Sequence, residues 1–196
     1  MDTVAIGRGF TEDERTRVAS LYWEAFSRKL RPGFADEPTG VAVVRAGLRT
    51  DHVLTARRGD QILGVCGFYD AGTGAADLTW TRLRRSLSVP AALRASLVLS
   101  LLSRPARPGS LVLDGLCVDS AARGLGIGTA LLSAASERAR QDGARTVRLS
   151  VVDGNPRARA LYERRGFVPV ESGTIGILSL VYGFDGYTAM ELAVDK

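Results

Sequence analysis

The stretch "RGLGIGTALL", Arg123–Leu132, places three glycines within six residues and continues at once into residues that favour a helix. The segment before it, "SLVLDGLCV", Ser110–Val118, is typical of a buried strand. A strand that leads through a glycine-rich turn to a helix start leaves backbone N–H groups unpaired at the positive end of the helix dipole. The stretch therefore predicts an anion site, most often one for a phosphate.

The spacing of the glycines separates three kinds of phosphate-binding loop. A P-loop requires Gly-Lys followed by Ser or Thr, and the sequence contains no Gly-Lys pair. A dinucleotide fingerprint requires a third glycine where Thr129 stands. The spacing Arg-x-x-Gly-x-Gly fits Arg123, Gly126 and Gly128 without adjustment.

A second segment, "NPRARALYERRGF", Asn155–Phe167, follows the glycine loop. Together the two segments resemble the GNAT superfamily of acyl-CoA-dependent N-acyltransferases, in which the second reads Asn-x-x-(Ala)-x-x-x-Tyr-x-x-x-Gly-Phe. Asn155 and Tyr162 hold the matching positions, almost two helical turns apart, so both can face one cleft. The resemblance covers residues 110–172 strongly and the N-terminal helices and hairpin more loosely.

The resemblance implies an α/β fold of three layers, with a mixed central sheet, splayed fourth and fifth strands and helices on both faces. Hydrophobic periodicity and turn residues predict strands at 3–8, 52–58, 61–69, 110–118, 146–152, 167–172 and 187–194. They predict helices at 12–29, capped by Thr11, and at 39–47, 88–103, 155–166 and from the glycine loop to about Gly143.

Composition favours one soluble unit. The 196 residues are 45% hydrophobic and contain no repeat or linker, so we expect a single domain over 1–196, with a helical insertion at about 78–109. The longest apolar run, Leu97–Leu102, is far shorter than the roughly 20 residues of a membrane span. The N-terminus is acidic where a signal peptide is basic, so we expect a cytoplasmic protein.

The net charge of +5 comes almost entirely from arginine, since Lys29 and Lys196 are the only lysines. Guanidinium groups suit a partner that bears phosphate or carboxylate. The arginines are scattered among acidic residues with few aromatic side chains nearby, so we expect no nucleic-acid partner. Cys66 and Cys117 lie in apolar runs without metal-ligand spacing, which predicts buried thiols and no metal.

The family resemblance implies acetyl-CoA as acyl donor and an amine as acceptor. The backbone of 116–118 would pair with the pantetheine amides and donate an N–H to the thioester oxygen, and the glycine loop would hold the pyrophosphate. The implied cofactor-binding residues are Leu116, Cys117, Val118, Arg123, Gly124, Leu125, Gly126, Ile127, Gly128, Thr129, Asn155 and Tyr162.

Two residues are candidates for the proton transfers. Tyr162 would protonate the departing thiolate. Asp114 would act as base, because keeping a lysine-like amine neutral at pH 7 costs about 4.6 kcal/mol. The sequence equally allows Asp114 only to bind a cationic substrate. Glu171 and Glu191 are reserve candidates. His52, the only histidine, lies at the start of a predicted strand on the far side of the hairpin and is not expected to take part. Direct transfer is expected rather than a covalent step on Cys117.

Several questions stay open at the level of sequence. The acceptor amine is not identified. The arginines that bracket the insertion could line an acceptor site, contact phosphates or solvate a surface helix. The tail from Gly173 could cover the acceptor cleft or pair with a second subunit in a homodimer. A non-catalytic acyl-CoA sensor is the alternative function, which the presence of Tyr162 disfavours.

Overall fold

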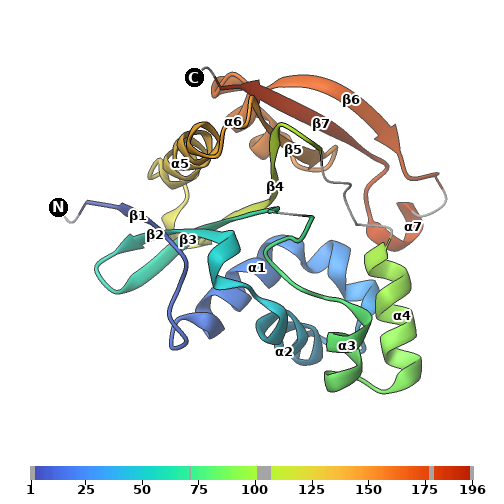
Figure 1. Ribbon diagram of the computed structural model, residues 1–196. Helices are drawn as coiled ribbons and strands as arrows, with labels where there is room; N and C mark the ends of the chain where they lie inside the picture. The colour runs from blue at the N-terminus through green and yellow to red at the C-terminus, as the bar shows by residue number, and fades with distance from the viewer. Residues whose placement is uncertain (1–2, 71, 101–106, 177–178, 195–196) are drawn as a thin grey trace.

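A seven-stranded mixed sheet organises the chain (Figure 1). The computed structural model describes residues 3–70, 72–100, 107–176 and 179–194. The strand order is β1-β2-β3-β4-β5-β7-β6, and β4 and β5 are parallel while the other neighbours are antiparallel. The strands are β1 Ala5–Arg8, β2 Val53–Arg58, β3 Gln61–Phe68, β4 Ser110–Val118, β5 Thr146–Val152, β6 Val168–Thr174 and β7 Gly186–Ala193.

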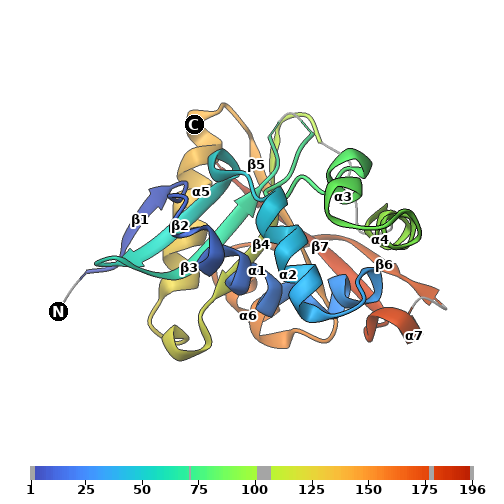
Figure 2. The same ribbon diagram turned by 90° about the horizontal axis from the view of Figure 1, so that it is seen from below.

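Helices cover both faces of the sheet, which confirms the predicted three layers (Figures 1 and 2). One core contains α5 and α6 side chains, and the other contains those of α1, α2 and α4. Strand β4 contributes to both, because Leu116 and Val118 pack against the first core and Cys117 belongs to the second. The helices are α1 Arg15–Leu30, α2 Glu37–Gly47, α3 Trp80–Ser86, α4 Val89–Ser100, α5 Ile127–Gln141, α6 Pro156–Arg164 and α7 Ser179–Tyr182.

Helix α1 begins at Arg15, three residues later than predicted. Thr11 does not cap it through its side chain; instead its backbone N–H donates to Glu14 Oε2 at 2.7 Å, and its carbonyl accepts from Glu14 N in a turn. Arg57 on β2 donates to both oxygens of Glu14 and lowers the pKa of that carboxyl to about 2. The carboxylate is thus committed to a tertiary contact, and the helix starts after it.

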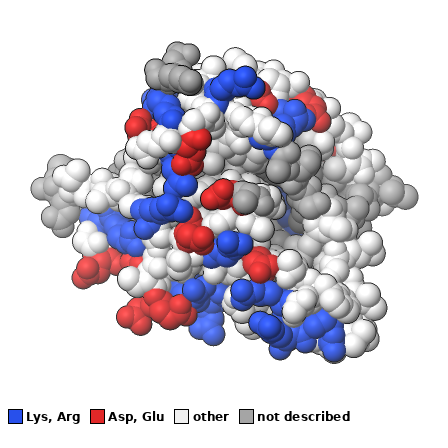
Figure 3. Space-filling view, in the orientation of Figure 1, with Lys and Arg blue, Asp and Glu red and all other residues white. Residues whose placement is uncertain are grey.

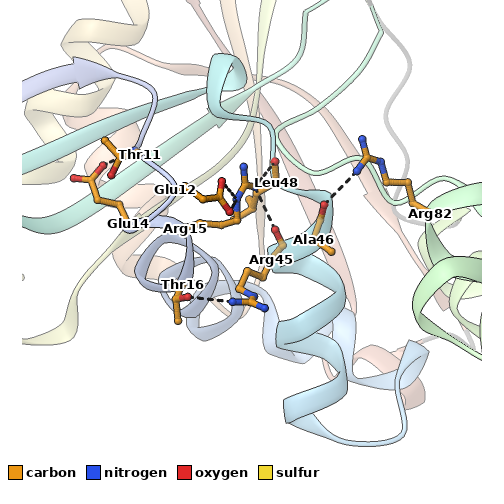
Figure 4. A network of polar contacts seen from close by, with 9 residues as sticks. All are labelled: Thr11, Glu12, Glu14, Arg15, Thr16, Arg45, Ala46, Leu48 and Arg82. Atoms are coloured by element: carbon orange, nitrogen blue, oxygen red, sulfur yellow. Dashed lines mark hydrogen bonds and ion pairs between the residues drawn. The ribbon is translucent and has the colours of Figure 1, made fainter.

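Arginines hold the carboxyl end of α2 against its neighbours (Figure 4). Arg15 donates to the carbonyl oxygens of Leu48 and Arg45, at 2.7 and 3.3 Å, and Arg82 donates to that of Ala46 at 3.3 Å. The last carbonyls of a helix have no intrahelical donor, so these guanidinium groups satisfy them and complement the negative end of the helix dipole. Helices α1, α2 and α3 are joined as a result.

The predicted insertion forms α3 and α4 on the same side of the sheet as α1 and α2 (Figure 2). The helix predicted at 88–103 is confirmed through Ser100, and positions 101–103, like Arg104, lie outside the described residues. Three of the arginines here bind nearby groups: Arg82 pairs with Asp77, Arg84 donates to the Leu87 carbonyl, and Arg107 pairs with Glu171. These contacts favour a structural role for the arginines over the two other roles that the sequence left open, which were to line an acceptor site or to contact phosphates.

Close packing of α1 on α2 generates a stability prediction. A Cβ at Gly40 would lie 2.2 Å from the ring of Trp23, so Gly40→Ala must displace a buried indole. Overpacking costs about 1–3 kcal/mol, and an approach of 2.2 Å to a buried ring places the cost in the upper part of that range. The gain in helix propensity returns only about 1 kcal/mol, so we expect a net loss of about 1–2 kcal/mol in the free energy of unfolding. Urea denaturation measures it.

Gly154→Ala is the control, because a Cβ there meets no atom within 4 Å. An unchanged midpoint for Gly40→Ala would contradict the close contact between α1 and α2.

Candidate active site

Strands β4 and β5 are adjacent but pair along only part of their length. Ser110, Leu111 and Val112 pair with Thr146, Val147 and Arg148, and no later residue of β4 is in register with β5. Strand β4 nevertheless stays paired with β3 as far as Val118, and β5 stays paired with β7 as far as Val152. The two strands therefore separate after Val112, as the splay predicted from the sequence requires.

A bulge in β4 accompanies this separation. Gly67 of β3 faces Gly115, but the next residue, Phe68, faces Leu113, so Asp114 is the extra residue. A bulge bends the strand that carries it and increases its twist. Here the bulge lies two residues after Val112, the last β4 residue that is paired with β5, at the point where the two strands separate.

The opening between the strands is a cavity of about 760 Å³. Both strands, the glycine loop, α1 and α6 line it. Every site residue predicted from the sequence belongs to this lining except Leu125, whose side chain is 54% exposed to solvent. Segments far apart in the sequence are thus brought to one cavity.

The glycine loop has the backbone that an anion site needs. Gly124 and Gly126 have φ angles of +84° and +77°, which residues with a Cβ rarely adopt. Gly126 is the N-cap of α5, so the first N–H groups of that helix have no intrahelical acceptor. A Cβ at Gly128 would lie 3.0 Å from Leu161 Cδ2. A side chain at position 128 would therefore crowd Leu161, whereas at Gly124 and Gly126 it is the backbone conformation that favours glycine.

Asp114 is held at the bulge by two neutral donors. Tyr22 of α1 donates its hydroxyl hydrogen to Asp114 Oδ2 at 2.6 Å, and the Ala75 N–H donates to the same oxygen at 3.2 Å. Burial, and then the neighbouring carboxylate, raise the pKa of Tyr22 well above its usual value. Tyr22 therefore remains a proton donor that orients Asp114, and the sequence carried no signal for this pairing across 92 positions.

Helix α6 brings Asn155 and Tyr162 to the same cavity. Asn155 is the N-cap of the helix, and its Oδ1 accepts from the Ala158 N–H at 3.1 Å. That bond uses only the oxygen of the carboxamide. Tyr162 is 7% exposed and its ring lies 5.9 Å from that of Phe167, so it is both a core residue and part of the cavity wall.

Comparison with known proteins identifies the family. The sequence profile described as "Acetyltransferase (GNAT) family" matches residues 15–167. The chain belongs to the GNAT acetyltransferase family. No curated protein matches it in sequence.

Solved structures share the GNAT fold at low sequence identity. An N-acetyltransferase from Staphylococcus aureus has a TM-score of 0.69 at 18% identity, over 96% of this chain and 100% of the other. An IAA acetyltransferase from Bacillus cereus has 0.60 at 17%, over 97% and 99%. A ribosomal-protein-alanine N-acetyltransferase from Brucella melitensis has 0.58 at 18%, over 96% and 99%. At these identities the likeness concerns the fold.

An ion pair joins the glycine loop to helix α1. Arg123 Nη2 lies 3.1 Å from Glu24 Oε1 on α1, and both side chains are about half exposed. The two residues line the same cavity. Because an exposed pair contributes at most about 1 kcal/mol, an anion with two or more negative charges can displace Glu24 from Arg123. Sequence reasoning missed Glu24, which only the fold places beside the loop.

A second cavity of about 550 Å³ adjoins this GNAT site. Loop 72–79, Trp80 at the start of α3, α1 and α4 line it. Asp114, Phe26 and Lys29 belong to the lining of both cavities. Asp114, the bulge residue, therefore belongs to a wall that the two cavities share.

The other acids considered from the sequence lie elsewhere. Arg148 donates to Glu191 and Glu171, each at 2.5 Å, and neither carboxylate lines the two cavities. His52 is 3% exposed, contacts the Thr73 carbonyl through Nδ1 at 3.1 Å, and also lies outside both cavities. Asp114 is accordingly the carboxylate that the fold brings to both cavities.

Two absences hold for the described ranges of the chain. No cluster of three His, Cys, Asp or Glu side chains there is arranged to hold a metal ion. In the same ranges no helix combines the length and the apolar character needed to cross a bilayer.

Both thiols are buried, which predicts chemical inertness. Burial raises the pKa of Cys66 to about 12 and that of Cys117 well above its usual value, and the charge of Asp114 adds to both shifts. Because the thiolate is the reactive species, we expect iodoacetamide at pH 8 to leave both residues unmodified in the native protein. Mass spectrometry checks this, with urea-unfolded protein as the positive control. Rapid alkylation of native Cys117 would instead indicate an accessible thiol suited to covalent transfer.

Proposed function

We propose that this GNAT protein transfers an acetyl group from acetyl-CoA directly to a primary amine. One observation carries the proposal: Asp114 lines both the cavity that includes the glycine loop and a second cavity beside it. Direct transfer needs a donor site and an acceptor site that share a proton-accepting group. The family match supports the donor, and the acceptor remains to be identified.

The residues of the first cavity fit coenzyme A. The N–H groups at the start of α5 and the guanidinium of Arg123 would hold the pyrophosphate. The edge of β4 at Leu116, Cys117 and Val118, which is not paired with β5, would bind the pantetheine amides as an added strand does. Acetyl-CoA supplies the activated acetyl group as a thioester.

Two side chains would carry out the proton transfers of the reaction. Asp114, oriented by Tyr22 and Ala75, would accept the proton of the ammonium form, directly or through water. A backbone N–H near Val118 would donate to the thioester oxygen as negative charge develops there. Tyr162 would donate its hydroxyl proton to the departing thiolate.

Two broader features complete the proposal. Both halves of the sequence contribute strands to one sheet, which supports a single domain over 1–196. A cytoplasmic location would suit two free thiols, because the cytosol keeps thiols reduced.

Cofactor binding is tested by thermal stability. A ligand that binds only the folded state stabilises it by about 2.7 kcal/mol at 100 times its dissociation constant, so saturating acetyl-CoA should raise Tm by several degrees. Free coenzyme A should act similarly, and NAD at equal concentration should not. A shift with NAD and none with acetyl-CoA would contradict the donor assignment.

Substitution of the two proton-transfer residues tests the mechanism. We expect Asp114→Asn and Tyr162→Phe each to lower kcat by roughly 10²- to 10⁴-fold at saturating acetyl-CoA, measured by thiol release. Asp60→Asn, in an exposed turn, and Tyr187→Phe, outside both cavities, are the controls.

The pH profile separates a base from a simple cation site. Without a base, the rate should follow the fraction of free amine, so the kcat of Asp114→Asn should rise about tenfold per pH unit below the pKa of the acceptor. If Asp114 only bound the cation, the substitution would instead raise KM and leave the pH dependence of kcat the same as in the native protein.

A further inference from the structure

The second cavity differs in character from the first. Its walls include four aromatic side chains, Tyr22, Phe26, Tyr69 and Trp80, together with Leu78 and Leu99. A space of about 550 Å³ falls in the range of small-molecule sites, which are mostly apolar with a few placed polar groups. Much of this wall comes from loop 72–79, from Trp80 at the start of α3 and from α4. Helices α3 and α4 are part of the insertion, and the loop leads into it.

The carboxylate is accessible from this cavity because of a glycine. A Cβ at Gly74 would lie 3.0 Å from Asp114 Oδ2 and 3.1 Å from Tyr69 Cζ. Gly74, Tyr69 and Asp114 all line the cavity, so the absence of a side chain at 74 leaves room beside the carboxylate. An amine that reaches Asp114 there would have its carbon body among the aromatic walls.

The charged groups around the cavity favour an acceptor that carries a single positive charge. The other acid in its lining, Asp77, is paired with Arg82 at 3.0 Å and also accepts from the Thr79 N–H. Lys29 lines both cavities, with Nζ 5.9 Å from the Phe26 ring and 5.7 Å from the Phe184 ring. An acceptor with a second ammonium group would find Asp77, the other carboxylate in this lining, already paired with Arg82.

We propose that the acceptor is a small primary monoamine with an apolar, preferably aromatic, body. The amine is directed to Asp114, and the body occupies the space between Trp80, Tyr69 and Leu99. Polyamines and lysine side chains of peptides are poor acceptors, because each would bring further charge or polar backbone into an apolar cavity. This inference rests on the acetyl transfer proposed above.

The first experiment compares three acceptors. Thiol release is measured with 2-phenylethylamine, spermidine and a short lysine-containing peptide at saturating acetyl-CoA. We expect kcat/KM for 2-phenylethylamine to exceed the other two by roughly tenfold or more. Equal values, a preference for spermidine or the peptide, or no acetylation of 2-phenylethylamine would overturn the inference.

The acetyl-CoA Tm shift, measured on the same preparation, separates the two proposals. If acetyl-CoA stabilises the protein but 2-phenylethylamine is not preferred, the acceptor inference fails and donor binding stands. If acetyl-CoA does not stabilise the protein, the proposed function itself fails.

A matched pair of variants tests whether the acceptor binds in the second cavity. Leu99 and Leu97 lie on the same helix, α4, but only Leu99 lines the cavity, and Leu97 is 67% exposed. We expect Leu99→Ala to raise the KM for 2-phenylethylamine roughly tenfold, with the KM for acetyl-CoA unchanged, and Leu97→Ala to change neither.

The variant Trp80→Ala provides a second test of the same cavity, which holds even if Leu99→Ala destabilises the fold. Trp80 is 45% exposed, so its truncation should leave Tm near that of the native protein while raising the KM for 2-phenylethylamine. If neither Trp80→Ala nor Leu99→Ala raises this KM more than Leu97→Ala does, the amine does not occupy the second cavity and the inference is wrong.

Discussion

The bulge at Asp114 is the constraint on which the rest of the site depends. It follows the last residue pair between β4 and β5, so the sheet remains continuous at one end and is open at the other. Without the opening, the backbone edge of Leu116–Val118 would pair with β5 and no cavity would separate the strands. The same bulge carries Asp114, whose carboxylate lines the cavity and accepts a hydrogen bond from Tyr22.

The two sides of the opening have different chemistry. The cavity that we propose for the donor is lined largely by backbone: positive-φ glycines, a helix start and a strand edge that is not paired with β5. Such groups recognise a constant ligand without side-chain variation. The cavity that we propose for the acceptor is lined by side chains from α1, loop 72–79, α3 and α4, so it can differ between relatives that share the fold. GNAT membership therefore identifies the chemistry of transfer more closely than the identity of the amine.

Helix α1 links these two sides. Its Tyr22 orients Asp114, its Phe26 and Lys29 belong to both cavities, and its Glu24 pairs with Arg123 at the glycine loop. The helix is held by Arg57 at its start and by packing of Trp23 near Gly40. Its position is therefore fixed by stability contacts that lie outside the cavities.

The sequence by itself determined the glycine loop before a helix, the Asn155 and Tyr162 segment and the positions of the strands along the chain, because these depend on local glycine spacing and hydrophobic periodicity. Its errors were also local: Thr11 has the composition of a cap, but the Glu14–Arg57 contact delays the start of α1. Only the tertiary structure decided that Tyr22 and Ala75 orient Asp114, that Glu24 meets Arg123, and that Trp80 and Leu99 wall a second cavity. Those contacts join residues tens of positions apart, and periodicity reports which face of an element is buried but not what it is buried against.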